Sequence, residues 1–219
     1  DVFDTMLYDE AKNLGVDVCF GTVVKSVEYV NDDEIIVNEK YKARKYVNAA
    51  GVFGVAKRCQ LNFPLGISSR IVGHARVKDE CFYFFRYTEY GDGYAWMFPV
   101  GDNVWNIGCW SCIYKKNIKY LYNDFENLVK KQYINFEYYD RKPQGALLGV
   151  GNCIYNTDYD IGDAALLVDN YSGEGISLAI ESGINMALKI VGKEQILFPK
   201  KTVVYLSEQE MENYDYREI

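Results

Sequence analysis

A glycine-rich run in the last third of the chain constrains the fold most tightly. The run reads Gly162-Asp163-Ala164-Ala165, then a short apolar spacer, then Ser172-Gly173-Glu174-Gly175-Ile176. Glycine lets the backbone turn sharply and come close to a ligand. From Ile176 to Val191 apolar residues recur at helical spacing, and Gly192 ends the pattern. The sequence therefore predicts a close turn that leads directly into a long helix.

The start of this predicted helix is suited to an anion. Free backbone N–H groups and the positive end of the helix dipole, roughly half a unit charge, favour negative charge there. Asp163 can accept hydrogen bonds from sugar hydroxyls, and the small residue Ala164 leaves room beside it. A stripe of Ala179, Gly183 and Ala187 lets the helix lie close to a sheet or a ligand. A plain loop before a core helix explains any single glycine pair, whereas the whole run favours a ligand site.

A central block of alternating runs predicts an antiparallel sheet. The runs span residues 81–87, 94–100 and 104–109, with glycine-containing turns between them. Alternation places Tyr94, Trp96 and Phe98 on one face of a strand. Three aromatic rings on one face would form a wall for an apolar ligand, although an ordinary aromatic core strand has the same spacing.

The N-terminal block predicts a helix followed by three strands. Asp1 is expected to cap the helix, and Gly15 to end it. Its apolar residues share one face: Phe3, Met6, Leu7, Ala11 and Leu14. The strand-like runs span 23–30, 34–38 and 42–48, and the last leads into a close-packed turn at Ala49-Ala50-Gly51. Further helices are predicted near 118–129 and 205–212, and a short strand or loop over 145–151.

The run from Gly162 to Ile176 resembles the second flavin-contacting motif of the para-hydroxybenzoate-hydroxylase-like FAD flavoproteins, in the geranylgeranyl reductase branch. The resemblance implies that Asp163 binds the ribityl chain of FAD. It also implies that the isoalloxazine ring faces four residues, Gly173, Glu174, Gly175 and Ile176. Residues 45–51 resemble the strand and turn of that family that end in Ala-(Asp or Thr)-Gly, which places Ala49 and Gly51 at the cofactor.

The segment Tyr94-Ala95-Trp96-Met97-Phe98-Pro99 resembles the Tyr-x-Trp-x-Phe-Pro signature of geranylgeranyl reductases. That signature lines the substrate cavity beside the flavin. The resemblance therefore implies substrate contacts for Tyr94, Trp96, Phe98 and Pro99. Two features differ from the family, because Val100 stands where Lys is common and Gly108-Cys109-Trp110 stands for Gly-x-Gly. These differences leave the exact substrate open.

The expected fold class is α/β (α+β), with a partial Rossmann-like FAD-binding domain interleaved with an antiparallel substrate-binding sheet. Residues 1–66 would form the first part of the FAD domain, 67–148 the substrate domain, and 149–219 the return with a C-terminal helix. The pyrophosphate-binding Gly-x-Gly-x-x-Gly segment of the family is not in the sequence, so a fragment is expected. Asp160, in the strand expected before Gly162, would need a partner if buried, and a distorted strand is expected.

Composition excludes some partners. The chain has 24 Lys and Arg against 31 Asp and Glu, a net charge of -7, which disfavours nucleic acid. The six cysteines are expected to be reduced thiols in a cytosolic protein. Cys109 and Cys112 have redox-motif spacing, but residues three apart on a strand face opposite ways. His74 is expected to be structural, and the spacing of possible ligands indicates no metal site. A lipid substrate would bring the protein into peripheral contact with a membrane.

The leading functional hypothesis is a flavin-dependent oxidoreductase that uses FAD. The expected reaction is hydride reduction of a carbon–carbon double bond in an isoprenoid or another apolar substrate. No catalytic residue, proton donor or electron donor is assigned. Two alternatives stay open: a FAD-dependent monooxygenase or halogenase on the same fold, and a non-catalytic fragment that keeps an aromatic pocket.

Overall fold

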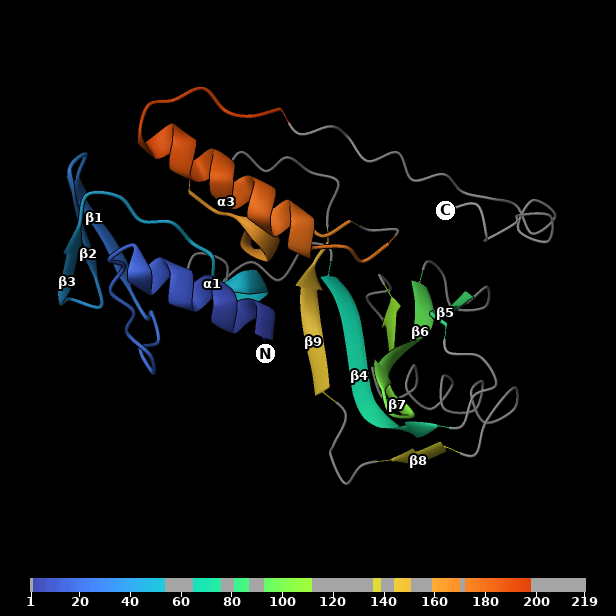
Figure 1. Ribbon diagram of the computed structural model, residues 1–219. Helices are drawn as coiled ribbons and strands as arrows, with labels where there is room; N and C mark the ends of the chain where they lie inside the picture. Colours follow the sequence, from blue (N-terminus) through green and yellow to red (C-terminus); the bar gives the residue numbers. More distant parts are fainter. Residues whose placement is uncertain are drawn as a thin grey trace.

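The computed structural model describes residues 2–53, 65–75, 81–86, 93–111, 136–138, 144–150, 159–169 and 172–197. Within these residues the chain combines α-helices with two antiparallel sheets, as expected for an α+β protein (Figure 1). Asp1, Cys112 and the helices predicted near 118–129 and 205–212 lie outside the described residues. The proposed domain boundaries at 66 and 148 stay predictions.

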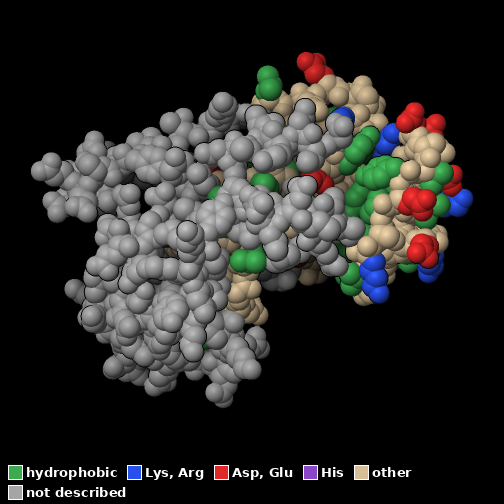
Figure 2. Space-filling view, turned by 180° about the vertical axis from the view of Figure 1, so that it is seen from behind, with side chains coloured by type: hydrophobic (Ala, Val, Ile, Leu, Met, Phe, Trp, Pro, Cys, Tyr) green, Lys and Arg blue, Asp and Glu red, His purple; other side chains and the backbone are tan. Residues whose placement is uncertain are grey.

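The first helix, α1 (Val2–Asn13), confirms the N-terminal prediction. Gly15 follows it with a φ of 87°. None of the described side chains of α1 is buried; Met6, for example, is 56% exposed. Figure 2 shows apolar side chains beside acidic and basic ones on the side of the molecule formed by the N-terminal elements. The apolar face of α1 is therefore open within the described structure.

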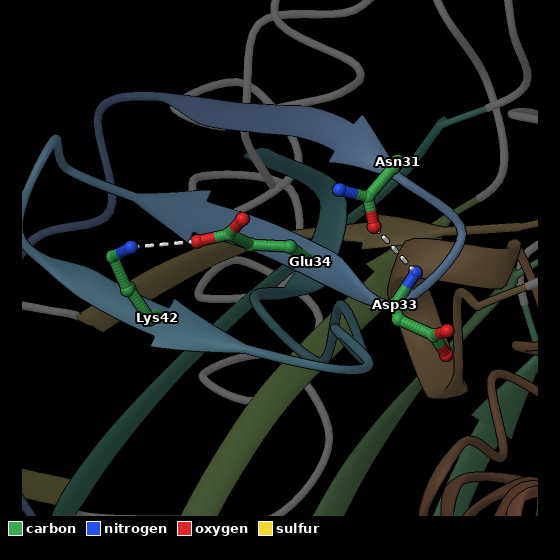
Figure 3. Close-up of polar contacts among 4 residues, drawn as sticks. All are labelled: Asn31, Asp33, Glu34 and Lys42. Carbon is green, nitrogen blue, oxygen red and sulfur yellow. Dashed lines mark hydrogen bonds and ion pairs between the residues drawn. The ribbon is translucent and has the colours of Figure 1, made fainter.

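A small antiparallel sheet follows, with β1 (Val27–Asn31), β2 (Glu34–Val37) and β3 (Tyr41–Ala43) in that order. Asn31 Oδ1 accepts the Asp33 N–H at 2.9 Å in the first turn, and Lys42 Nζ pairs with Glu34 Oε1 at 2.7 Å across the sheet (Figure 3). The sheet confirms the presence of the three predicted strands.

The predicted bounds of the outer two strands were wrong. The run predicted to start at residue 23 forms a strand only from Val27. Before that point the Asn38 side chain takes the place of a partner strand: its Nδ2 donates to Val23 O at 2.8 Å and its Oδ1 accepts the Lys25 N–H at 2.7 Å. The third run ends as a strand at Ala43 rather than 48.

Six strands form the larger sheet. They are β4 (Leu65–Ala75), β5 (Tyr83–Arg86), β6 (Gly93–Gly101), β7 (Val104–Ser111), β8 (Phe136–Tyr138) and β9 (Gln144–Gly149). The order is β5-β6-β7-β4-β8, and β9 also pairs with β4. The three strands predicted in this block are confirmed. The short strand or loop predicted over 145–151 is the strand β9 over 144–149. The central strand, β4, was not predicted.

The two faces of the large sheet differ. One face, here called the buried face, consists of Ala95, Met97, Trp105, Ile107 and Cys109, each at most 2% exposed. Cross-strand register places these residues opposite one another, with Ala95 against Cys109 and Met97 against Ile107. Their alternating neighbours point to the other face, so a single pair of strands presents a closed core on one side and a different surface on the other.

The glycine-rich run forms η3 (Gly162–Ala165), a single turn of 3-10 helix, and leads on to α3 (Ile176–Ile190). Gly175 precedes the helix and Gly192 follows it, which confirms both predicted ends. A parallel bridge between Val150 and Val168 joins this region to the end of β9, and α3 lies beside η3 (Figure 1). None of the described helices is long and apolar enough to cross a membrane.

Candidate functional site

Three segments pack around η3. They are η1 (Gly51–Phe53), the end of β9 and the helix α3. Asn48 forms a parallel bridge with Asp160, so the turn that carries Ala49 and Gly51 runs beside the start of η3. The structure thus brings together the two stretches for which the sequence predicted cofactor contacts. The contacts themselves stay predictions.

The turn at Gly51 is not close-packed, contrary to the prediction. A side chain at this position would meet no atom of the described residues within 4 Å. Instead, Gly51 has a φ of 64°, a left-handed conformation that glycine adopts without strain. Ala49 is exposed. This turn is therefore shaped by its backbone conformation and has open space on the side where a side chain would point.

Asn48 is the partner that Asp160 required. Its Nδ2 donates to Asp160 Oδ1 at 2.9 Å, and Asn48 is only 1% exposed. The backbones also pair, because Asn48 N donates to Tyr159 O at 2.8 Å and Ile161 N donates to Asn48 O at 3.1 Å. Within residues 159–161 the expected strand is reduced to this isolated bridge, which agrees with the distortion predicted from Asp160.

The small-residue stripe of α3 packs against η3. A side chain at Gly162 would stand 3.1 Å from Ala179 Cβ, so a larger residue at either position would push the helix away. The Gly162 N–H donates to Ser182 Oγ at 3.0 Å, and that hydroxyl donates to Ala179 O at 3.0 Å. Two small residues and one hydroxyl therefore hold the helix directly on the Gly-Asp turn.

Asp163 is half-buried and has spare capacity to accept hydrogen bonds. Among the described residues its carboxylate accepts one, from the Gly149 N–H to Oδ2 at 3.4 Å. Burial raises the pKa of Asp163, while the Gly149 hydrogen bond lowers it by less. The other oxygen, Oδ1, lies 3.5 Å from the position that a Cβ at Gly175 would take. The carboxylate thus faces the turn before α3, where hydroxyl donors would satisfy it.

The turn before α3 is held from one side by Asp169. Its Oδ1 accepts the Ser172 N–H at 2.6 Å and the Ser172 hydroxyl at 2.8 Å. Its backbone accepts the Gly173 N–H and donates to Glu174 O, each at 2.9 Å. No side chain caps α3 at Gly175. The turn is therefore well ordered by its own hydrogen bonds, and it leads into the positive end of the α3 dipole, which favours an acceptor or an anion.

Trp110 occupies the space beside Gly173, a contact that the sequence analysis missed. Gly173 has a φ of 69°, and a Cβ there would collide with the indole of Trp110. Trp110 is 2% exposed. Its Nε1 is the one buried side-chain nitrogen or oxygen, within the described part of the chain, that has no hydrogen-bond partner. Only the departure from Gly-x-Gly at 108–110 singled this residue out in the sequence.

Five rings line the other side of the large sheet. We call them the aromatic face: Phe82, Phe84, Tyr94, Trp96 and Phe98. Neighbouring ring centroids are 5.1 to 6.1 Å apart, within the range of favourable aromatic contacts. Phe82 and Phe84 are 66% and 63% exposed. The prediction that Tyr94, Trp96 and Phe98 share one face is confirmed.

Two details shape this surface. The Trp96 indole lies over Gly108, where a Cβ would collide with it, and its Nε1 donates to Asn106 Oδ1 at 3.2 Å. Pro99 lies opposite Trp105 in the register between β6 and β7, so alternation places it on the other side of the sheet. The structure therefore does not bring Pro99 together with the three aromatic residues for which substrate contacts were predicted.

A hydrogen bond joins the aromatic face to the turn before α3. The Tyr94 hydroxyl donates to Ser172 O at 2.8 Å, across 78 residues of sequence. Burial, and to a lesser extent the Glu174 carboxylate, raises the pKa of Tyr94. The hydroxyl therefore keeps its proton and remains a donor at neutral pH. Tyr94 is thus the point at which the predicted substrate wall meets the predicted cofactor turn.

The other candidate groups lie apart from this site. Cys109 is on the buried face, and none of the described cysteines Cys19, Cys81 and Cys109 is in a disulfide. His74 is exposed on β4. Within the described ranges, no group of three or more His, Cys, Asp or Glu side chains is placed to hold a metal ion. What the site offers is donors at the start of α3, the Asp163 carboxylate and an aromatic wall, which together fit a planar ligand with a hydroxylated chain.

Comparisons with known proteins point to one fold. No family model matches the sequence. No curated protein matches it significantly. A geranylgeranyl bacteriochlorophyll reductase-like protein from Thermoplasma acidophilum is similar in structure, with a TM-score of 0.69 and 19% identity over 87% of this chain and 54% of that one.

Two further solved structures are similar over the same part of the chain. The flavin-dependent halogenase CmlS has a TM-score of 0.58 and 16% identity, over 88% of this chain and 40% of its own. The anhydrotetracycline hydroxylase OxyS from Streptomyces rimosus has a TM-score of 0.53 and 16% identity, over 86% and 42%. The chain thus spans about half the length of these proteins or less, and over that part it has their fold.

Proposed function

We propose that the protein containing this chain is a flavin-dependent oxidoreductase that binds FAD at the run from Gly162 to Ile176. One observation carries the proposal, namely the hydrogen bond from the Tyr94 hydroxyl to Ser172 O at 2.8 Å. The sequence assigned Tyr94 to a substrate wall and Ser172-Gly173 to a cofactor turn. An oxidoreductase needs these two sites in contact, because hydride transfer requires the reacting atoms to be close.

Each part of the site has a role in this proposal. The Asp163 carboxylate accepts hydrogen bonds from the ribityl hydroxyls, and the first N–H groups of α3 bind the acceptor atoms of the flavin ring. The aromatic face holds an apolar substrate, with the exposed rings of Phe82 and Phe84 at its outer end. Bound and reduced, FAD supplies the hydride for reduction of a carbon–carbon double bond. An isoprenoid or another lipid is the substrate class that fits a wall of five rings.

The test uses the purified protein that contains this chain, loaded with FAD and reduced by dithionite without oxygen. With a geranylgeranyl lipid as the probe, we expect products heavier by two hydrogens for each double bond reduced. A saturated phytanyl lipid serves as the control and should be unchanged. No mass gain from any unsaturated isoprenoid would rule out this reductase reaction.

A second reaction class is favoured by the structural neighbours. CmlS is a flavin-dependent halogenase and OxyS a hydroxylase, so the same fold serves oxygen-dependent chemistry. A product that forms only with oxygen and NAD(P)H, with or without halide, would favour this class over the reductase. Failure of the protein to bind FAD at all would favour a non-catalytic role for the aromatic pocket.

A further inference from the structure

Trp110 lies where the large sheet meets the turn before α3. In the ladder it pairs with Tyr94 on β6 and with Ser68 on β4. It therefore belongs to the same side of the sheet as the aromatic face. Unlike the outer rings of that face, Trp110 is enclosed, with 2% of its surface exposed, because its indole packs against Gly173.

The indole N–H of Trp110 is a buried donor without an acceptor. Such groups are rare in folded proteins, because burial removes their hydrogen bonds to water without a replacement. Two acceptors of the turn that contains Gly173 already have donors: Ser172 O accepts the Tyr94 hydroxyl, and Asp169 Oδ1 accepts both the N–H and the hydroxyl of Ser172. An acceptor atom of a bound molecule would give the indole N–H its missing hydrogen bond.

The positive end of a helix dipole lies next to the indole. Gly175, two residues after Gly173, directly precedes α3, and the start of a helix favours negative charge and acceptor atoms. An indole N–H group is a donor only. Both features therefore favour a ligand with acceptor oxygens or nitrogens, and both disfavour a metal cation.

We propose that the indole N–H of Trp110 donates a hydrogen bond to an acceptor atom of the ligand bound at the turn from Ser172 to Gly175. The inference rests on the proposed function, in which this ligand is FAD and the acceptor belongs to its ring. The nitrogen is enclosed in the free protein, so FAD binding must shift the Ser172-Gly173 turn enough to admit that acceptor. Trp110 is then a binding residue that orients the ring against the sheet.

Substitution of Trp110 by Phe separates this role from a structural one. The change removes the N–H and keeps an aromatic ring. Because the free protein gains no hydrogen bond from the N–H, any loss of Tm in the Trp110→Phe variant without FAD should come from the smaller ring alone and should be no larger than that of a Trp→Phe change at an equally enclosed site. FAD affinity, followed by flavin fluorescence in an equilibrium titration, should fall about three- to tenfold, the usual effect of one hydrogen bond.

Trp105→Phe is the matched control. Trp105 lies on the same strand, is equally enclosed at 2% exposure, and points to the buried face. This variant should lower the Tm and leave FAD affinity unchanged. Equal FAD affinities for Trp110→Phe and the wild type would overturn the proposal. If the wild type does not bind FAD, the proposed function fails together with this inference. If the wild type binds FAD and Trp110→Phe binds it equally well, only this inference fails.

A measurement on the wild-type protein covers the case in which Trp110→Phe does not fold. With ¹⁵N-labelled tryptophan, each of the three Trp residues of this chain gives one indole resonance, and Trp96→Phe and Trp105→Phe identify that of Trp110 among these three by elimination. A new hydrogen bond to FAD should move the Trp110 indole proton downfield. A resonance that stays in place at saturating FAD would overturn the proposal.

Discussion

The two faces of the large sheet are built from the same strands but differ in how exposed their side chains are. On the buried face, Met97 and Ile107 oppose each other and are each 1% exposed. On the aromatic face, Phe84 and Trp96 oppose each other, and Phe84 is 63% exposed. Strand alternation thus lets one segment carry a closed core and an open aromatic surface. Large exposed aromatic groups in contact with one another indicate a binding surface.

The aromatic side of the sheet is divided into an inner and an outer part. Trp110 and Tyr94 contact the turn before α3 and lose exposure there. Phe82 and Phe84 stay exposed. Under the proposed function, the buried face provides stability, the inner aromatic residues contact the cofactor, and the outer rings contact the substrate. The variants below are ordered by the size of their expected effect on stability.

Ile107→Ala tests the buried face and should have the largest effect. Removing an enclosed side chain from a packed core leaves a cavity, which costs about 2–5 kcal/mol of unfolding free energy. Chemical denaturation measures the loss. Because Ile107 points away from the aromatic face, the folded variant should bind FAD like the wild type. A stability loss below about 1 kcal/mol would show that this face is less well packed than described.

Gly108→Ala tests how tightly the aromatic face is built. A Cβ here would collide with the Trp96 ring and stand 2.6 Å from Ser69 O. Overpacking of this kind typically costs about 1–3 kcal/mol, and Trp96 fluorescence should change. The control is Gly183→Ala in α3, where the nearest atom is 3.9 Å away. That change should be neutral or stabilise by about 0.4–1 kcal/mol. Equal effects of the two changes would contradict the close contact.

Tyr94→Phe tests the junction between the aromatic face and the turn. The variant loses the hydrogen bond to Ser172 O and should be destabilised by about 0.5–1.5 kcal/mol. Hydrogen exchange of the amides at 172–175 should become faster, because the turn loses one of its contacts. Unchanged exchange there would mean that the Tyr94 hydroxyl does not hold the turn.

Phe84→Ala tests the outer part and should affect stability least. An exposed position changes unfolding free energy by no more than about 0.5 kcal/mol. The affinity for a geranylgeranyl lipid, in contrast, should fall several-fold, because the variant loses the ring contacts with Tyr94 and Phe98. A large stability loss with unchanged lipid binding would assign Phe84 to the core instead.

Local patterns were enough to predict much of this fold. Alternation identified β6 and β7 and the shared face of Tyr94, Trp96 and Phe98, because each signal lies within a few residues. Helical spacing and the glycines at 175 and 192 set the bounds of α3. The central strand β4 was not predicted because its sequence, with glycines and serines among the apolar residues, does not alternate clearly. Its identity as a strand depends on β7 and β9 at its sides.

The junctions of the site depend on long-range contacts, which no local pattern encodes. Asp160 was expected to need a partner, but nothing in the sequence pointed to Asn48, 112 residues away. The same holds for Trp110 beside Gly173. The resemblance placed Gly173 against the isoalloxazine ring, and nothing in the sequence indicated that the Trp110 indole packs against it. Sequence reasoning thus identified the parts of the site and missed how two of them pack together.

The pH dependence of FAD binding follows from Asp163. Burial raises its pKa above the ordinary 3.8, so the folded protein holds the proton more tightly than the unfolded chain. Stability from this group is therefore present at low pH and is lost as the pH rises from 3.8 through the raised value. Under the proposed function, the ionised carboxylate accepts hydrogen bonds from the ribityl hydroxyls more strongly than the protonated acid does. FAD affinity should accordingly increase across the same interval, and Asp163→Asn should abolish this increase.

The most direct measurement of the central claim is an FAD titration of the wild type, Asp163→Asn and Asp102→Asn at neutral pH. Asp102 is an exposed residue in the turn between β6 and β7 and serves as the matched control. Hydrogen bonds to a charged group contribute about 1.5–3 kcal/mol, so Asp163→Asn should weaken FAD binding at least about tenfold, and Asp102→Asn should not. Equal affinity for all three proteins, or no FAD binding by the wild type, would contradict the account.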